Sequence, residues 1–243
     1  MLIQSNLWLA AQELANIQMR YAESGRTLSE AALCGAKDFI EWQHYPINDL
    51  VDEVSGYEFY YHAHSADEMP HGEHGHFHVI KRDLKGFHHL IGIALNPKGL
   101  PIRLFTTNQW VTGEEMEDST MVIKSMRGFE IAKKGRMALL SRWVSALITL
   151  FSVEIEGLIL ERDQKIAQLV AAMGGRGLVM NSKKHHVLTE CKIDLIERLS
   201  DHLSVVNSQG NRNEKDSMAF GLRSNKLSNL GPGNYLAWSC SQR

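Results

Sequence analysis

The sequence predicts an α+β fold, with a central antiparallel meander of about four strands flanked by N-terminal and C-terminal helices. Two observations carry this prediction. Apolar residues recur with a helical period in the first 45 residues, with a period of about two from Gly56 to Asn108, and with a helical period again after Trp110. Short, turn-rich separators join the strand-like segments, and short connections favour antiparallel neighbours.

Two helices are expected at the start of the chain, within residues 1–45. Apolar residues of segment 6–22 fall near one helical face. The sequence TLSE at 27–30 is typical of a capping box, with Thr27 as the N-cap and Glu30 reaching back to the exposed amides. The apolar stripe then continues until Pro46 stops it.

The sheet is expected over residues 56–108, as four segments of alternating character. They are Tyr57–His64, His74–Arg82, His88–Asn96 and Ile102–Asn108.

Helices are expected again over residues 115–206. Met116–Ile131 reads as one helix, Met137–Met173 as one long or two broken helices, and His186–Val206 as another, with GGRG at 174–177 as a break. We therefore expect a single α+β domain over residues 1–206. The remaining segment, 207–243, is rich in Asn, Ser and Gly and is expected to be a poorly ordered tail.

The bulk composition is that of an ordinary globular protein and excludes several classes. A formal charge of −2 gives no general attraction to nucleic acid or to an anionic membrane. Three scattered cysteines indicate neither a disulfide framework nor a thiolate zinc site. The first twenty residues lack the features of a signal peptide, and the longest apolar run is too short to span a bilayer. We expect a cytoplasmic protein.

Six of the twelve histidines lie in residues 61–78, in the sequence YHAHSADEMPHGEHGHFH. Because alternate side chains of a strand share a face, His62 and His64 point one way on the first strand. If His64 lies opposite His74 in a hairpin, then His62 lies opposite His76, and four imidazoles converge on one patch. The predicted metal ligands are His62, His64, His74, His76 and His78.

Neutral imidazole is the commonest protein ligand for transition metals, and it suits iron, zinc, copper and nickel alike. The sequence therefore predicts a transition metal ion without choosing among these four. Two other interpretations stay open. The histidines can form a solvated surface of mutually hydrogen-bonded rings, or a pH switch that titrates near their ordinary pKa. His88 and His89 are adjacent, so only one of them can join the cluster, and the strand register decides which.

The spacing Gly56-x5-His62-x-His64-x3-Glu68-x6-Gly75 is similar to the first motif of the cupin superfamily. This resemblance implies a small β-barrel in which His62, His64 and Glu68 hold a metal. The second cupin motif is absent, because Ile102 stands where its histidine belongs. The predicted helices and the small number of strands also depart from a closed barrel.

A second resemblance covers more of the chain. The blocks EHGHFH at 73–78 and LFTTNQWVTGE at 104–114 resemble those of an uncharacterised family of bacterial proteins, over roughly residues 55–130. This resemblance implies a grouping and supplies no mechanism.

The segment RLFTTNQWVTGEE ends the last predicted strand and enters a loop, where functional groups often lie. The residues predicted to bind substrate are Arg103, Thr107, Asn108 and Trp110, and the predicted acid or base groups are Glu68 and Glu114. The simpler interpretation is that Arg103 is an ordinary strand-edge arginine, that TGEE caps the next helix and that Trp110 belongs to the core.

The sequence thus favours a metal-dependent enzyme with a mononuclear non-haem centre on a β-hairpin, acting on a small molecule. Two histidines and a carboxylate would favour iron and oxygen chemistry, whereas three histidines with an open position would favour zinc and hydrolysis. The alternative is a non-enzymatic protein that binds or senses a transition metal. Nucleotide-binding and phosphate-loop motifs are absent from the sequence. No nucleic acid or membrane partner is expected, and a homo-oligomer is compatible with the sequence.

Overall fold

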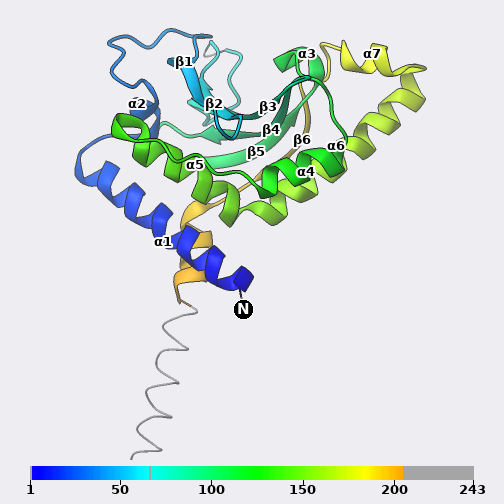
Figure 1. Ribbon diagram of the computed structural model, residues 1–243. Helices are drawn as coiled ribbons and strands as arrows, with labels where there is room; N and C mark the ends of the chain where they lie inside the picture. The colour runs from blue at the N-terminus through cyan, green and yellow to red at the C-terminus, as the bar shows by residue number, and fades with distance from the viewer. Residues whose placement is uncertain (1, 66, 205–243) are drawn as a thin grey trace, which may run out of the picture. The chain divides into compact units, whose positions relative to one another are not determined.

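The computed structural model describes residues 2–65 and 67–204, and it contains one antiparallel sheet whose six strands lie in the order of the chain (Figure 1). The α+β prediction is confirmed, with two strands more than expected. The strands are β1 Tyr45–Asp52, β2 Tyr57–His62, β3 Gly75–Asp83, β4 Gly86–Leu95, β5 Pro101–Thr107 and β6 Val187–Lys192.

Strands β2 to β5 match the four predicted segments to within two residues at each end. The other two strands were not predicted. Strand β1 lies almost wholly between the predicted N-terminal helices and the predicted sheet, where no element was expected. Strand β6 lies at the start of the predicted last helix, of which residues 195–204 are helical.

The helices are α1 Leu2–Glu23, α2 Leu28–Ala32, α3 Gln109–Thr112, α4 Ser119–Arg127, α5 Ala138–Leu150, α6 Ser152–Met173 and α7 Arg176–Met180, with a 3-10 turn at Gly135–Met137. The predicted capping box is confirmed: Thr27 accepts from the Glu30 amide, and the Glu30 carboxylate accepts from the Thr27 amide. Helix α2 ends earlier than predicted, because Cys34 and Gly35 follow it with positive φ angles.

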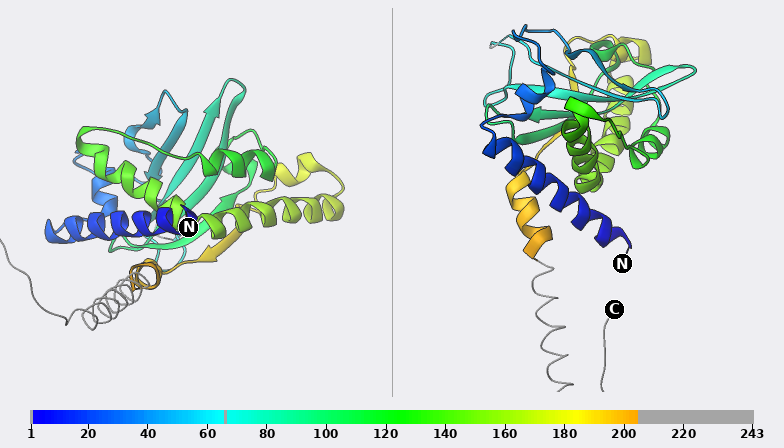
Figure 2. Two further views of the ribbon diagram at one scale, coloured as in Figure 1. Left: turned by 60° about the horizontal axis from the view of Figure 1, so that its bottom comes forward. Right: turned by 60° about the vertical axis from the view of Figure 1, so that its left-hand side comes forward.

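One face of the sheet carries the hydrophobic core, and α1, α4, α5 and α6 lie on that side (Figures 1 and 2). Phe59, Phe77, Ile93 and Leu104 point into this core and are fully buried. The ring of Phe77 lies 6.1 Å from that of Trp143, which is also fully buried, so α5 packs directly on the centre of the sheet.

The opposite face of the sheet is polar and aromatic, yet it is also buried. It carries Glu58, Tyr60, His62, His76, His78, His89, Phe105 and Thr107, none of them more than 9% exposed. Burying polar side chains is unfavourable unless they find hydrogen-bond partners. A polar face that is buried is therefore the first place to look for a functional site.

A close packing contact supports the polar face. The ring of Phe105 on β5 covers Gly92 on β4 so tightly that a Cβ atom there would lie 2.3 Å from the ring. The same ring lies 5.3 Å from the ring of His76 and 5.9 Å from that of His78. Only glycine leaves room at position 92 for the ring that packs against these histidines.

The Gly92→Ala variant is therefore expected to lower the free energy of unfolding by about 1–3 kcal/mol, because Phe105 must move within a packed layer. Urea unfolding measures the change. Gly157→Ala is the matched control: its Cβ meets nothing within 4 Å inside helix α6, and it should stabilise by about 0.5–1 kcal/mol. If Gly92→Ala lowered the free energy of unfolding no more than Gly157→Ala does, the tight contact between Gly92 and Phe105 would be contradicted.

Among the residues that the structure describes, no single helix is long and apolar enough to cross a membrane; α5 with its preceding turn and α6 pass that test only as a pair bent by 72°. The predicted poorly ordered tail, residues 207–243, lies outside the described residues.

Candidate metal centre

Three histidines meet on the polar face of the sheet. His62 ends β2 and lies opposite His76 on β3, in the register that the sequence predicted, and His78 lies two residues further along β3 on the same face. Each of the three side chains offers a nitrogen, and these nitrogens all lie within 4.8 Å of one another. The arrangement follows from strand parity, because the intervening Phe77 points into the core.

The orientation of the three rings fits a single ion. The Nε2 atoms of His62 and His76 lie 2.8 Å apart, and two nitrogens that bind one ion at about 2.0–2.1 Å lie roughly 3 Å from each other. The three ring planes are nearly perpendicular in pairs, with angles of 82°, 79° and 82°. Three mutually perpendicular rings around one point can occupy one side of a coordination sphere and leave the other side open.

Glu73 holds His76 from behind. The His76 Nδ1–H donates to Glu73 Oε1 at 2.7 Å, and Arg103 donates to Glu73 Oε2 at 2.6 Å and to Glu190 at 2.6 Å. Burial would raise the pKa of Glu73, but the hydrogen bonds from His76 and Arg103 outweigh it and hold that pKa below its usual value. An ionised Glu73 keeps the proton of His76 on Nδ1, so the Nε2 lone pair is available to an ion.

His89 plays the corresponding part behind His78. Its Nε2 lies 3.0 Å from His78 Nδ1, and its Nδ1 lies 3.3 Å from the Thr107 hydroxyl. A register shift between β3 and β4 turns His89 toward this face, whereas His88 hydrogen-bonds Ser125 on α4. The structure thus answers which of the two adjacent histidines joins the cluster.

Burial keeps three of these histidines uncharged. It lowers the pKa of His62 to about 2 and that of His89 to about 3, and it lowers the pKa of His78 well below its ordinary value. Neutral imidazoles are the form that binds metal. A cation at their centre would also remove the cost of holding so many ring nitrogens together away from water.

The other two predicted ligands lie at the margin. The His64 ring is 5.0 Å from that of His62 and 5.1 Å from that of His76, but it stacks on Trp42 and stands outside the three-nitrogen group. His74 is exposed, and its Nδ1 lies 2.7 Å from the hydroxyl of Tyr61, a residue of the core face. Both lie just beyond the ends of their strands, where alternation no longer fixes direction.

The two predicted acid or base residues differ sharply in environment. Glu68 is exposed and accepts a hydrogen bond from Ser65, away from the three nitrogens. Glu114 is buried beside β4, where it accepts from the His89 amide at 2.7 Å and from the Thr112 hydroxyl. Burial raises the pKa of Glu114 to about 7, so its carboxyl can exchange a proton near neutral pH.

The residues predicted to bind substrate are already hydrogen-bonded within the protein. Arg103 and Thr107 hold Glu73 and His89, as described above. Asn108 caps helix α3 and donates to the Val179 carbonyl, and the Trp110 indole N–H donates to the His185 carbonyl. These contacts join the end of β5 to the segment before β6.

Sequence reasoning missed Glu73 as a partner of the cluster and missed the aromatic residues beside it. Glu73 could have been found from the spacing Glu-x-x-His, which places a carboxylate three residues before His76. The His44 ring stacks on that of Tyr60 at 3.6 Å, and its Nδ1 lies 3.1 Å from Asp49 Oδ1. Neither contact has a local sequence signal.

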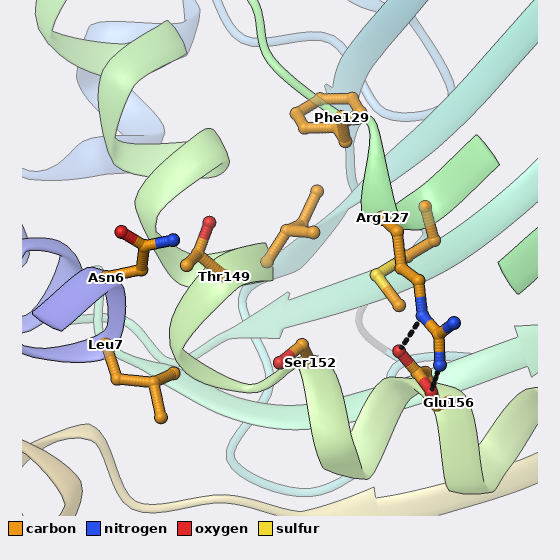
Figure 3. A pocket seen from close by; sticks show the side chains of 9 residues that line it. Asn6, Leu7, Arg127, Phe129, Thr149, Ser152 and Glu156 are labelled. Atoms are coloured by element: carbon orange, nitrogen blue, oxygen red, sulfur yellow. Dashed lines mark hydrogen bonds and ion pairs between the residues drawn. The ribbon is translucent and has the colours of Figure 1, made fainter. Parts of the chain in front are cut away.

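A separate pocket lies in the helical layer, away from the histidines. Its volume is about 340 Å³, and Arg127 and Glu156 form a bidentate ion pair at its edge (Figure 3). Its lining comes from α1, α4, α5 and α6 and includes none of the cluster residues.

The fold and the site together define an α+β protein with a buried histidine cluster that could hold a metal ion. The chain belongs to the family described as Domain of unknown function (DUF6969), whose model matches residues 8–193 and so spans the whole sheet. A search of curated proteins and a search of solved structures gave no match. The open sheet, with β1 and β6 at its two edges, differs from the closed barrel that the cupin resemblance implied.

Proposed function

We propose that this chain is a metal-dependent enzyme with a mononuclear transition-metal centre at His62, His76 and His78, acting on a small molecule. One observation carries the proposal: three imidazoles converge on one face, and Glu73 and His89 fix two of them from behind. Metal-binding histidines almost always have such a partner on the other ring nitrogen.

The donor set favours activation of water. Three neutral ligands leave the full charge of a divalent ion in place, and such an ion lowers the pKa of bound water to near 7 and supplies a nucleophile at neutral pH. The protein's own part is to hold the ring nitrogens deprotonated and aligned. Glu114, with a pKa of about 7 and a direct bond to the His89 amide, is the carboxyl that would hold or release a proton beside the centre.

A second function, non-enzymatic metal binding, is favoured by the burial of the ligands. His62, His76 and His78 are only 9%, 5% and 2% exposed. A closed coordination sphere suits storage or sensing, whereas an open position suits catalysis.

Cobalt(II) separates these two functions. The protein stripped of its metal with a chelator should bind about one equivalent of added cobalt per chain, and azide should then change the visible spectrum, because an open position accepts it. Stoichiometric cobalt with a spectrum insensitive to azide would favour the non-enzymatic function. Failure to bind cobalt, zinc, iron(II), copper or nickel would contradict both.

A further inference from the structure

Two aromatic side chains from the segment between α2 and β1 cover the polar face next to the three histidines. We call Trp42 and His44 the aromatic cover. Each stacks on a ring of that face or next to it: Trp42 on His64 at 4.1 Å, and His44 on Tyr60 at 3.6 Å. The loop that carries them lies on the opposite side of the sheet from α5 and α6 (Figure 1). The rings of the two stacks lie nearly parallel, with interplanar angles of 16° and 8°.

Trp42 stands out within this cover. Its side chain is 54% exposed, although a tryptophan is the largest apolar surface a residue can bury. Its backbone has φ of 66°, in the left-handed region that bulky residues rarely adopt, and its amide donates to the Ala63 carbonyl at 2.8 Å. A strained, anchored backbone that presents an exposed indole is typical of a binding position.

Two apolar side chains close to Trp42 in the sequence are also exposed. Ile40 is 57% exposed on the same loop, and Ile47 is 63% exposed on the first strand after it.

The Trp42 indole lies close to the three histidines, and its position indicates what kind of ligand it can bind. Trp42 and His64 stack face to face, and the His64 ring lies 5.0 Å and 5.1 Å from the rings of His62 and His76. The His64 ring therefore lies between the Trp42 indole and two of the three proposed metal ligands, His62 and His76. The His64 ring makes ring contacts and no hydrogen bond among the described residues, so it can leave that position without breaking one.

We propose that the metal centre takes a planar aromatic ligand, whose ring stacks on Trp42 in the place of His64 and whose donor atom faces His62 and His76. This inference rests on the proposed function. The part of the ligand that stacks on Trp42 carries no negative charge, because the carboxylates of Glu68 and Glu73 both act on the His64 position. A phenol or an aromatic alcohol has this chemistry.

The test compares two ligands of matched size, phenol and cyclohexanol, by isothermal titration of the zinc-loaded full chain. Stacking adds to simple burial, so phenol should bind roughly three- to tenfold more tightly than cyclohexanol. Trp42→Leu should abolish this preference with unchanged zinc per chain, and Trp42→Phe should restore most of it. The side chain is exposed, so both variants should keep the thermal unfolding temperature of the parent.

The outcomes separate this inference from the proposed function. Equal affinity for the two ligands in the zinc-loaded parent, or a preference retained in Trp42→Leu, would overturn the inference alone. Absence of bound metal would overturn the proposed function, and the inference with it. A dimer in sedimentation experiments that Trp42→Leu dissociates would assign the apolar surface to contact between copies of the chain, and would also overturn the inference.

Discussion

The His76→Ala variant is expected to lose nearly all bound metal, from about one equivalent per chain to less than about a tenth, because three ligands become two. His76 is central in two ways. Its Nε2 lies 2.8 Å from that of His62, and its Nδ1 carries the hydrogen bond to Glu73. Elemental analysis of the untagged protein, purified without chelator, measures the loss.

Two further histidine variants complete that experiment. His185→Ala is the control. His185 lies outside the cluster, and its backbone carbonyl, which accepts from Trp110, is kept in the variant, so the metal content of His185→Ala should equal that of the parent. His64→Ala distinguishes a three-ligand centre, which keeps its metal, from a four-ligand centre, which loses it. Equal metal contents in His76→Ala and His185→Ala would contradict the centre itself.

The metal-free protein is expected to lose stability steeply below pH 6.5. Burial holds the pKa of His62 at about 2 and that of His89 at about 3 in the folded chain, so below the unfolded value of about 6.5 the unfolded chain binds more protons. Stability is thus fully present above that value and is lost as the pH falls toward the folded pKa values. Each group contributes about 1.4 kcal/mol per pH unit, so the two together contribute about 3 kcal/mol per unit.

Urea unfolding of the metal-free protein at pH values of about 7, 6 and 5 measures this slope. The exposed His71 provides the control, since His71→Gln should leave the slope unchanged. A free energy of unfolding that is flat over this range would show that the buried histidines are protonated in the folded state. Saturating zinc should raise the free energy of unfolding by a similar amount at each pH, because His62 and His78 are already unprotonated in the folded chain over this range.

The four central strands were predictable because alternation is regular from β2 to β5. Strand β1 was not, since Pro46 lies in it and Asp49 has a φ of 52° at a register shift, which destroys the period of two. Strand β6 pairs with β5 across a long stretch of helical sequence, and its six residues carry no local signal of that partner.

The histidine cluster was predictable as far as strand parity reaches. His62, His76 and His78 lie inside strands and share a face, as alternation requires. His74 precedes β3 and His64 follows β2, so parity says nothing about their direction. The choice of His89 over His88 depends on a bulge between β3 and β4, and a bulge of this kind is set by packing rather than by local sequence.

Arg103 shows how a correct residue can carry an unexpected role. The sequence placed Arg103 among the residues predicted to bind substrate, with an ordinary strand-edge arginine as the simpler interpretation. In the structure two carboxylates of the chain itself, Glu73 and Glu190, take both sides of the guanidinium. The partner on β6 is remote in sequence, so pairing within the protein could not be anticipated.

The distribution of the site along the chain has a consequence for the order of events during synthesis. All three nitrogen donors come from one hairpin, between residues 62 and 78, whereas Glu190, which fixes Arg103 and through it Glu73, is translated more than a hundred residues later. A nascent chain therefore contains all three histidines of the cluster long before the last strand can pair with β5. The hydrogen bond that Arg103 donates to Glu190, which fixes Glu73 in turn, can form only late in synthesis.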